Sequence, residues 1–381
     1  MGTSLSVGYQ MKILYIFRSI AVWGGIERVL VDKMNSLASM YGYQIFMLTT
    51  DQGSHPVPYP LGKEVYLEDL NIQFHHQYRY SGIKRLMVSR RLACLFEQRL
   101  LNHLKVIKPD VIICTTANYV DINILVKIKG DIPLVIESHS ICTQTLNQKG
   151  FRNKIANLMF RRGLAKSDVL ISLTEGDAAD WRRIHSNVKV IPDIVHLNKG
   201  RKSSCYHKRV IWVGRFDYQK RPIEIIKIWE KVYPQFPDWH LDIYGEGEQQ
   251  QELEDTVTSL NMNIHVHHPA DRIFEVYRRS SILVSTSLFE PFGLVIPEAM
   301  SCGLPVISYN CPFGPSTMIL DGNNGFLVDN NNRSLFAVKL SLLMSDMSLR
   351  QKMGQVASCS VHQFSAERIM PMWKELFENF L

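Results

Sequence analysis

Residues 281–308 read SILVSTSLFEPFGLVIPEAMSCGLPVIS, and this stretch decides the fold class. Its two apolar runs, Ile282–Ser285 and Pro305–Ser308, have the Ile, Leu and Val content typical of strands buried in a parallel sheet. Between them lie a polar loop that carries Glu290 and a predicted helix that carries Glu298 in its first turns. A strand, a helix and a second strand in this order form a βαβ unit, so the stretch predicts an α/β protein with a parallel sheet.

The same alternation extends towards both ends of the chain. Further strands are predicted at the apolar runs Lys12–Phe17, Gln44–Thr49, Val111–Cys114, Leu134–Ile136, Val169–Leu173, Val210–Gly214, His240–Tyr244 and Asn263–Val266. Longer amphipathic segments, among them Gly25–Met40 and Ile83–Lys105, are predicted to be helices. The 381 residues suit two domains of roughly 150–200 residues each. We therefore expect two Rossmann-like domains facing a central cleft, with ligands at the carboxyl ends of the strands.

A polar and basic interval, Asn198–Lys208, interrupts this alternation and marks the predicted domain boundary. The predicted organisation is a disordered extension (1–10), a first domain (11–192), a linker (193–208), a second domain (209–362) and a terminal helix (363–381). The terminal helix has Trp373, Leu376 and Phe377 on one side. We expect that side to pack back on the first domain.

Composition excludes several classes of protein. No apolar run approaches the ~18–20 residues that cross a bilayer, which excludes a transmembrane enzyme. The seven cysteines include no C-x2-C pair, which excludes a zinc ribbon and favours a reducing, cytoplasmic setting. Residues 1–192 contain 24 Lys and Arg against 15 Asp and Glu, whereas residues 193–381 contain 19 against 21. This basic first half favours an anionic partner such as a membrane surface; no motif supports nucleic acid.

The turn that leads into the helix of the opening stretch has the features of a nucleotide site. Phe292, Gly293 and Leu294 stand where backbone amides are free at a helix start, and the positive end of the helix dipole suits a diphosphate. A carboxylate such as Glu298 in the first turns can reach ribose hydroxyls. Glu290 or Glu298 taken alone is more often a solvated residue, and only their spacing within the βαβ unit favours binding.

Several motifs together carry a family resemblance. They are Glu290-x7-Glu298 with AMSCGLPVI at 299–307, VGRF at 213–216 with Gln219 and Lys220, YGEG at 244–247, DGNNGFLV at 321–328 and CPFGP at 311–315. In this combination the sequence resembles glycosyltransferase family 4, the retaining nucleotide-sugar transferases with a GT-B fold, over residues 11–380. The motif at 311–315 further resembles a bacterial subgroup that builds lipopolysaccharide, capsule and other surface glycans, mostly from UDP-activated hexoses.

The resemblance implies catalytic roles in the second domain. Arg215 and Lys220 would neutralise the departing diphosphate, as two cations at a strand end can do. Glu290 would hold hydroxyls of the transferred sugar, and Glu298 would hold the ribose. No D-x-D pair is present, so we expect neither a metal nor another cofactor. The G-x-G at Gly245 lacks the third glycine of a dinucleotide fingerprint, and we expect it to shape the loop beside the nucleobase.

In the first domain, Gly24 and Gly25 follow the first predicted strand, where two glycines let backbone approach a phosphate or sugar. An ordinary strand-to-helix turn is the alternative. His139 follows a later strand, and the resemblance implies that it lies over the donor sugar as an active-site residue. Two departures from the family pattern are Ser140, which replaces the usual Asp after this histidine, and Asp193, which replaces the usual Asn at the interdomain crossing.

The helix predicted at 83–105 has a basic sector formed by Lys84, Arg85, Arg91 and Arg99. Its apolar residues, including Ile83, Leu86 and Met87, fall on the opposite side, where we expect the core. The basic sector is predicted to contact an anionic membrane or the acceptor, with an ordinary solvated helix face as the alternative.

The sequence thus predicts a metal-independent, retaining α-glycosyltransferase that moves a hexose or N-acetylhexosamine from a UDP-sugar to a lipid-linked, lipopolysaccharide or capsule acceptor. It would act in the cytoplasm, as a peripheral protein on the inner face of the membrane. A non-catalytic sugar-nucleotide or glycan-binding scaffold of the same fold is the alternative, and an NAD-linked oxidoreductase is excluded by the missing G-x-G-x-x-G motif.

Overall fold

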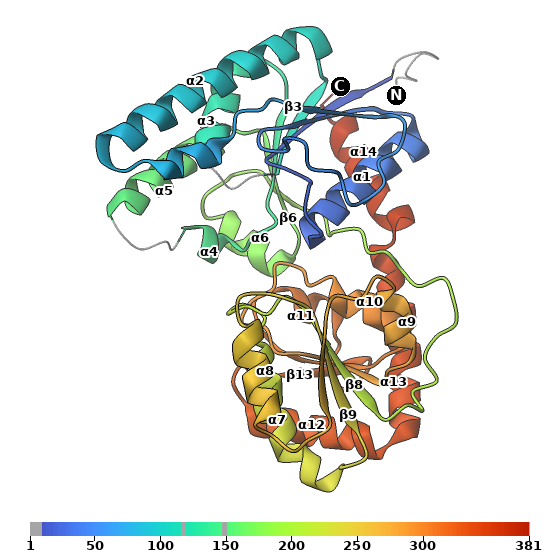
Figure 1. The fold of residues 1–381 in the computed structure, drawn as a ribbon. Helices are drawn as coiled ribbons and strands as arrows, with labels where there is room; N and C mark the ends of the chain where they lie inside the picture. The colour runs from blue at the N-terminus through green and yellow to red at the C-terminus, as the bar shows by residue number, and fades with distance from the viewer. Residues whose placement is uncertain (1–9, 116–118, 147–150, 381) are drawn as a thin grey trace. The chain divides into compact units, whose positions relative to one another are not determined.

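The computed structural model describes residues 10–115, 119–146 and 151–380, and its contacts divide the chain into two units (Figure 1). The first unit is Met1–Ile194 with Ile369–Leu381, and the second is Val195–Arg368. Apart from Gln10, the predicted N-terminal extension lies outside the described residues. Each unit is a parallel α/β domain, as the sequence predicts.

The first unit is built on a seven-stranded sheet of order β3-β2-β1-β4-β5-β6-β7, in which every pair of neighbouring strands is parallel. Its strands are β1 (Lys12–Phe17), β2 (Gln44–Thr49), β3 (Val65–Asp69), β4 (Val111–Cys114), β5 (Leu134–Glu137), β6 (Val169–Ser172) and β7 (Val188–Val190). Its helices are α1 (Gly25–Tyr41), η1 (Phe74–Arg79), α2 (Gly82–Ile107), α3 (Tyr119–Ile128), α4 (Cys142–Leu146), α5 (Phe151–Leu164), α6 (Glu175–Trp181) and most of α14 (Ala366–Glu378). Figure 1 shows α2, α3 and α5 on one face of this sheet and α1 and α14 on the other.

Helix α14 packs on the first unit through its apolar side. Trp373, Leu376 and Phe377 are all buried. The ring of Phe377 contacts that of Tyr43 with centroids 6.3 Å apart, and the Lys33 ammonium lies 4.3 Å from the centre of the Trp373 ring. The C-terminal helix is therefore part of the core of the unit that contains the N-terminal strand.

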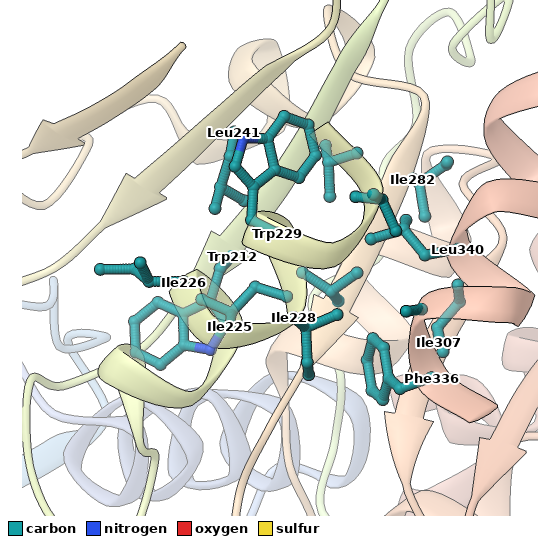
Figure 2. Packing of buried hydrophobic residues seen from close by; sticks show 14 of the residues in the cluster. Trp212, Ile225, Ile226, Ile228, Trp229, Leu241, Ile282, Ile307, Phe336 and Leu340 are labelled. Carbon is teal, nitrogen blue, oxygen red and sulfur yellow. The ribbon is translucent and has the colours of Figure 1, made fainter. Parts of the chain in front are cut away.

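The second unit is built on a six-stranded parallel sheet of order β10-β9-β8-β11-β12-β13. Its strands are β8 (Arg209–Val213), β9 (His240–Tyr244), β10 (Ile264–His267), β11 (Ile282–Ser285), β12 (Val306–Tyr309) and β13 (Gly325–Val328). Its helices are α7 (Pro222–Val232), η2 (Tyr233–Gln235), α8 (Gln250–Thr258), α9 (Ile273–Arg278), α10 (Val295–Ser301), α11 (Gly314–Met318), α12 (Arg333–Ser345), α13 (Met347–Ser360) and η3 (Val361–Phe364). Figure 2 shows the core between α7, α12 and the sheet, where Trp229 and Phe336 pack among aliphatic side chains.

Sequence periodicity misses three strands, β3, β7 and β13, all of which lie at sheet edges. In β3 and β7 only the first residue is buried, so they lack the continuous apolar content of the central strands. The predicted linker also differs from the structure. Residues from Val195 onward belong to the second unit, where Cys205 is buried and its carbonyl oxygen accepts hydrogen bonds from the Arg350 guanidinium.

Helix α2 is where the sequence prediction is most clearly wrong. Ile83, Leu86 and Met87, expected in the core, are 79%, 70% and 67% exposed. A helix of 26 residues is roughly 39 Å long, about twice the length of a six-residue strand, so its first turns have no sheet to cover. The buried residues of α2 all lie in its second half: Phe96, Leu100, Leu104 and Ile107. No helix among the described residues is long and apolar enough to cross a membrane.

Candidate functional site

In the second unit the site is organised by the loop that follows β8. Gly214 and Phe216 each donate a backbone hydrogen bond to the turn after β9, at Tyr244 and Glu246. Gly245 has a φ of +156°, and a Cβ there would lie 1.9 Å from the Gly214 carbonyl oxygen. The glycine predicted beside the nucleobase is thus required for close packing against the loop that carries Arg215.

Lys220 is fixed at both its backbone and its side chain. Its backbone N–H donates to Asp217 Oδ1 at 2.9 Å, and its carbonyl oxygen accepts from the Thr286 hydroxyl at 3.1 Å. The Lys220 ammonium donates to Glu290 Oε1 at 2.5 Å. The side chain of Arg215 is less constrained. It is 69% exposed, and among the described residues it contacts Asp217 at 3.1 Å and Gln219 at 3.4 Å.

Glu290 is a buried carboxylate held on several sides. Its Oε1 atom accepts from Lys220 and from the Ser287 hydroxyl, the latter at 2.6 Å. Its backbone pairs with the segment after β12: Glu290 N–H donates to the Pro312 carbonyl, and the Phe313 and Gly314 amides donate to the Glu290 carbonyl. The structure therefore brings together Lys220 and Glu290, which lie 70 residues apart in the chain.

The other residues predicted to bind the donor lie close to this loop, with differing access. Glu298 is buried within α10, a helix of seven residues that begins one residue after Leu294. Gly293 has a φ of +92°, and a Cβ there would lie 3.6 Å from the Glu290 side chain. The side chain of Phe292 is buried against Phe364, with ring centroids 5.3 Å apart, so only its backbone could contact a ligand.

In the first unit, the residues at the carboxyl ends of β1, β4 and β5 line a cavity of about 390 Å³. Its wall includes Arg18, Glu27, Thr115 and His139. Gly24 and Gly25 stand at the start of α1 beside it, and a Cβ on Gly24 would lie 2.0 Å from Glu27 Oε2. The Glu27 carboxylate therefore occupies the space that the missing side chain leaves, and this favours the reading of Gly24 as a packing position.

His139 lies within a buried cluster of charged residues. Its Nε2 atom is 3.4 Å from Glu137 Oε1, and its Nδ1 atom is 3.6 Å from Asp193 Oδ1. The ammonium of Lys33 forms an ion pair with Glu137 Oε1 and lies over the rings of Tyr15 and Trp373. Four charged or ionisable side chains from α1, β5 and the segments after β5 and β7 thus meet in one place.

The electrostatics of this cluster follow from burial and pairing. Burial alone would raise the pKa of the Glu137 carboxyl, but Lys33 and His139 lower it to about 2. Burial opposes the protonated form of His139, yet Asp193 and Glu137 outweigh it and raise the pKa of the imidazole. Burial raises the pKa of Asp193 to about 6, against the lowering effect of His139.

Glu137, His139 and Asp193 each offer a possible metal-ligating atom, and these atoms lie within 4.8 Å of one another. The Lys33 ammonium already balances the Glu137 carboxylate at this place. A divalent cation would have to share the site with that buried ammonium, so the charges favour an ion-pair cluster over a metal centre.

A cavity of about 730 Å³ in the second unit is lined by none of the predicted site residues. It runs along β9 and α9 past Arg209, Asp242 and Tyr244. Asp242 is buried there, and it accepts from Arg209 and contacts His267, both at 2.8 Å. Arg209, Asp242 and His267 are thus paired with one another in this cavity.

The structure also shows residues that sequence reasoning missed or misplaced. Lys33 and Glu137 were not predicted; a lysine at a buried position on the apolar face of α1 was the available signal. Arg99, predicted on a binding surface, donates to the carbonyl oxygens of Leu70 and Asn71 and therefore holds a turn of its own unit.

Two family models match the chain. The model described as glycosyl transferases group 1 matches residues 203–358, and the model described as Glycosyltransferase Family 4 matches residues 23–199. The amylovoran biosynthesis glycosyltransferase AmsD of Erwinia amylovora is 26% identical over 375 residues, which cover 96% of this chain and 99% of that protein. A Campylobacter jejuni α-1,4-N-acetyl-D-galactosaminyltransferase, named for a diNAcBac-PP-undecaprenol-linked acceptor, is 25% identical over 96% of this chain and 98% of its own length.

A solved structure has a similar fold. The crystal structure of Anabaena HepE in complex with UDP covers 97% of this chain and 100% of its own, with a TM-score of 0.74 and 18% identity. Together with the two parallel sheets, this likeness confirms the predicted GT-B type of fold, with two Rossmann-like domains.

Proposed function

The chain belongs to glycosyltransferase family 4, and from this premise we propose that it transfers a hexose or N-acetylhexosamine from a UDP-sugar to a bacterial surface-glycan acceptor with retention of configuration. The observation that carries this proposal is the contact of Lys220 with Glu290 in the second unit. A second, exposed cation, Arg215, lies on the same loop. One carboxylate and two cations are the groups that a sugar with a diphosphate leaving group requires.

In the proposed reaction, the second unit binds the donor. Arg215 and Lys220 stabilise the negative charge that develops on the departing diphosphate, and Glu298 holds the ribose. Glu290 accepts hydrogen bonds from hydroxyls of the transferred sugar, since Lys220 and Ser287 use only its Oε1 atom among the described residues. UDP as the nucleotide is supported by the UDP-bound structure of HepE.

Retention is proposed to follow front-face transfer, in which an oxygen of the donor phosphate helps to remove the acceptor proton. Double displacement requires a carboxylate free to attack the anomeric carbon. Glu290 does not suit that role, because Lys220 and Ser287 both stabilise its charge. We propose that the two cations replace a metal ion, so that addition of EDTA leaves the rate unchanged.

For the acceptor, the Campylobacter relative acts on an undecaprenol-linked glycan, and we propose an acceptor of that lipid-linked type at the cytoplasmic face of the membrane. The start of α2 offers a surface for it, which we call the α2 patch: exposed Ile83, Leu86 and Met87 on one side of the helix and Lys84, Arg85 and Arg91 on the other. A helix with exposed apolar and basic sides suits binding at the surface of anionic lipid. Arg99 is not part of this patch.

A panel of UDP-, GDP- and dTDP-sugars, assayed for release of nucleoside diphosphate with and without a lipid-linked glycan, tests the proposal. Release from a UDP-hexose or UDP-N-acetylhexosamine, unaffected by EDTA, is expected. The anomeric configuration of the product, measured by NMR, decides between retention and inversion. Inhibition by EDTA that Mn²⁺ restores would contradict the metal-free mechanism, and failure of every donor would contradict the assigned reaction.

A further inference from the structure

The family resemblance leaves His139 without its usual acidic neighbour, because Ser140 follows it. In the structure the hydroxyl of Ser138 donates to the Ser140 carbonyl at 2.7 Å, so this turn is closed by uncharged groups. An imidazole that must hold one orientation and one protonation state normally needs a carboxylate or carbonyl partner on one ring nitrogen. A partner for His139 therefore has to come from elsewhere in the fold.

Asp193, from the segment after β7, supplies that carboxylate. Its Oδ1 atom lies 3.6 Å from His139 Nδ1, and both side chains are at least nine-tenths buried. Asp193 stands where the resembling family has Asn, so the charge missing at residue 140 is present at residue 193.

The other ring nitrogen is in a different situation. His139 Nε2 is buried and lies 3.4 Å from Glu137 Oε1, so a second carboxylate faces the ring on this side. Lys33 pairs with that same Glu137 oxygen and so weakens its hold on the imidazole. His139 lines the 390 Å³ cavity, and its ring orientation therefore bears on what the cavity binds.

We infer that Asp193 is a positioning residue for His139: its carboxylate faces Nδ1 while Glu137 faces Nε2, and Asp193 thereby holds the ring in one orientation at the wall of the cavity. The inference rests on the proposed function for the identity of the substrate, and on the geometry of the cluster for the pairing. The charged and titratable groups that face His139 are Glu137, Asp193, Lys33 and, through Lys33, the Tyr15 phenol.

The first test needs no activity. Imidazole NMR signals are titrated in the wild-type protein, with the His139 signal assigned by its loss in His139→Gln. We expect His139 to titrate above the ordinary value of about 6.5 and to titrate at lower pH in Asp193→Asn. A wild-type His139 that titrates at or below 6.5 would overturn the inference even if the variant does not fold, and even if the proposed reaction is wrong.

The second test uses the reaction. Asp193→Asn, which keeps the size of the side chain, should lower kcat by about tenfold or more and move the alkaline limb of the kcat/KM profile to lower pH. In the His139→Ala background the same Asp193→Asn change should alter kcat less than about twofold, because its effect passes through the imidazole. Equal losses in both backgrounds would show a merely structural role. Ser140→Ala is the matched control and should leave the pH profile unchanged.

Discussion

At the scale of single residues, the loop after β8 contains two cations, Lys220 and Arg215, for which the sequence predicts the same role. Their surroundings in the structure differ. Lys220 pairs with Glu290, whereas Arg215 is mostly exposed and, among the described residues, contacts only its own loop. An ammonium held in place can stabilise developing charge without rearranging, and that is how preorganised groups accelerate charge separation. In the proposed reaction, Arg215 would instead move to follow the diphosphate.

Replacement of either cation should therefore lower the rate of transfer. We expect Lys220→Ala and Arg215→Ala each to reduce kcat/KM by about 10²-fold or more, since the loss of one donor to developing charge costs about 2.7–4 kcal/mol. Lys227, an exposed lysine of α7, provides the control: Lys227→Ala should match the wild type. Steady-state release of nucleoside diphosphate measures all three, and wild-type activity in Lys220→Ala would remove this residue from the mechanism.

Substitution of the two glutamates of the E-x7-E motif should affect different steps. Glu298→Gln should chiefly weaken binding of UDP, because a ribose contact is made equally in the ground state and the transition state. Glu290→Gln should chiefly lower kcat, since it removes the charge that Lys220 orients. Isothermal titration of UDP and initial rates separate the two effects. Unchanged UDP affinity in Glu298→Gln would contradict its assignment to the ribose.

At the scale of elements, the turn after β9 packs closely against the loop after β8 and fixes the shape of that loop. Gly245→Ala should lower the midpoint of thermal unfolding and the activity together, because the new Cβ would overlap the Gly214 carbonyl oxygen. Gly322→Ala is the comparison. An alanine at the φ of +75° found there would also be strained, but no atom lies within 4 Å of the position of the new Cβ. We expect a loss of about 1 kcal/mol for Gly322→Ala and more for Gly245→Ala, and equal losses would show that backbone strain alone accounts for both.

The α2 patch makes a second prediction at this scale. Each of its three cations should contribute about 1 kcal/mol of attraction to anionic lipid, so the protein should co-sediment with phosphatidylglycerol vesicles at low salt and dissociate at high salt. Lys84→Gln/Arg85→Gln/Arg91→Gln should abolish co-sedimentation. Three exposed cations of the second unit serve as the control, and Lys227→Gln/Lys231→Gln/Lys352→Gln should co-sediment like the wild type. Co-sedimentation of the α2 variant at the wild-type level would assign the basic excess to another surface.

At the scale of the whole molecule, Lys33 connects three distant parts of the first unit. It lies on α1, pairs with Glu137 at the end of β5 and contacts Trp373 on the C-terminal helix. Lys33→Met should lower the free energy of unfolding by about 3–5 kcal/mol at pH 7, because it removes the ammonium that pairs with a buried carboxylate. Lys33→Met/Glu137→Gln should recover most of this loss, as measured by urea unfolding.

The stabilisation that the Lys33–Glu137 pair contributes should depend on pH in a defined direction. The pKa of Glu137 is lowered from 4.5 to about 2 by Lys33 and His139 against the cost of burial, so its pairing stabilises the fold above about pH 4.5. This contribution is lost as the pH falls from 4.5 towards 2. The difference in stability between the wild type and Lys33→Met should therefore narrow over that range, and a constant difference down to pH 2 would contradict the pairing.

Many strands, helices and motifs of this protein can be predicted from the sequence alone, because each depends on residues that are close together in the chain. The central strands are continuous apolar runs, the helices between them are amphipathic, and the motifs of the second unit lie on the turns that join them. Lys220 and Glu290 could be predicted to lie at one site, since parallel strands bring their carboxyl ends to one edge of a sheet, but their direct contact could not. The burial of Trp373, Leu376 and Phe377 likewise follows from helical periodicity.

What the tertiary structure alone decided are the places where distant segments meet or fail to meet. Periodicity gives the apolar face of α2 but not the length of sheet beneath it, so Ile83, Leu86 and Met87 were expected in the core and are exposed. Local sequence likewise shows no carboxylate after His139, because Asp193 reaches it from a segment more than fifty residues away. Charge pairing acts through space, and a partner that is remote along the chain becomes visible only when the fold brings the two groups together.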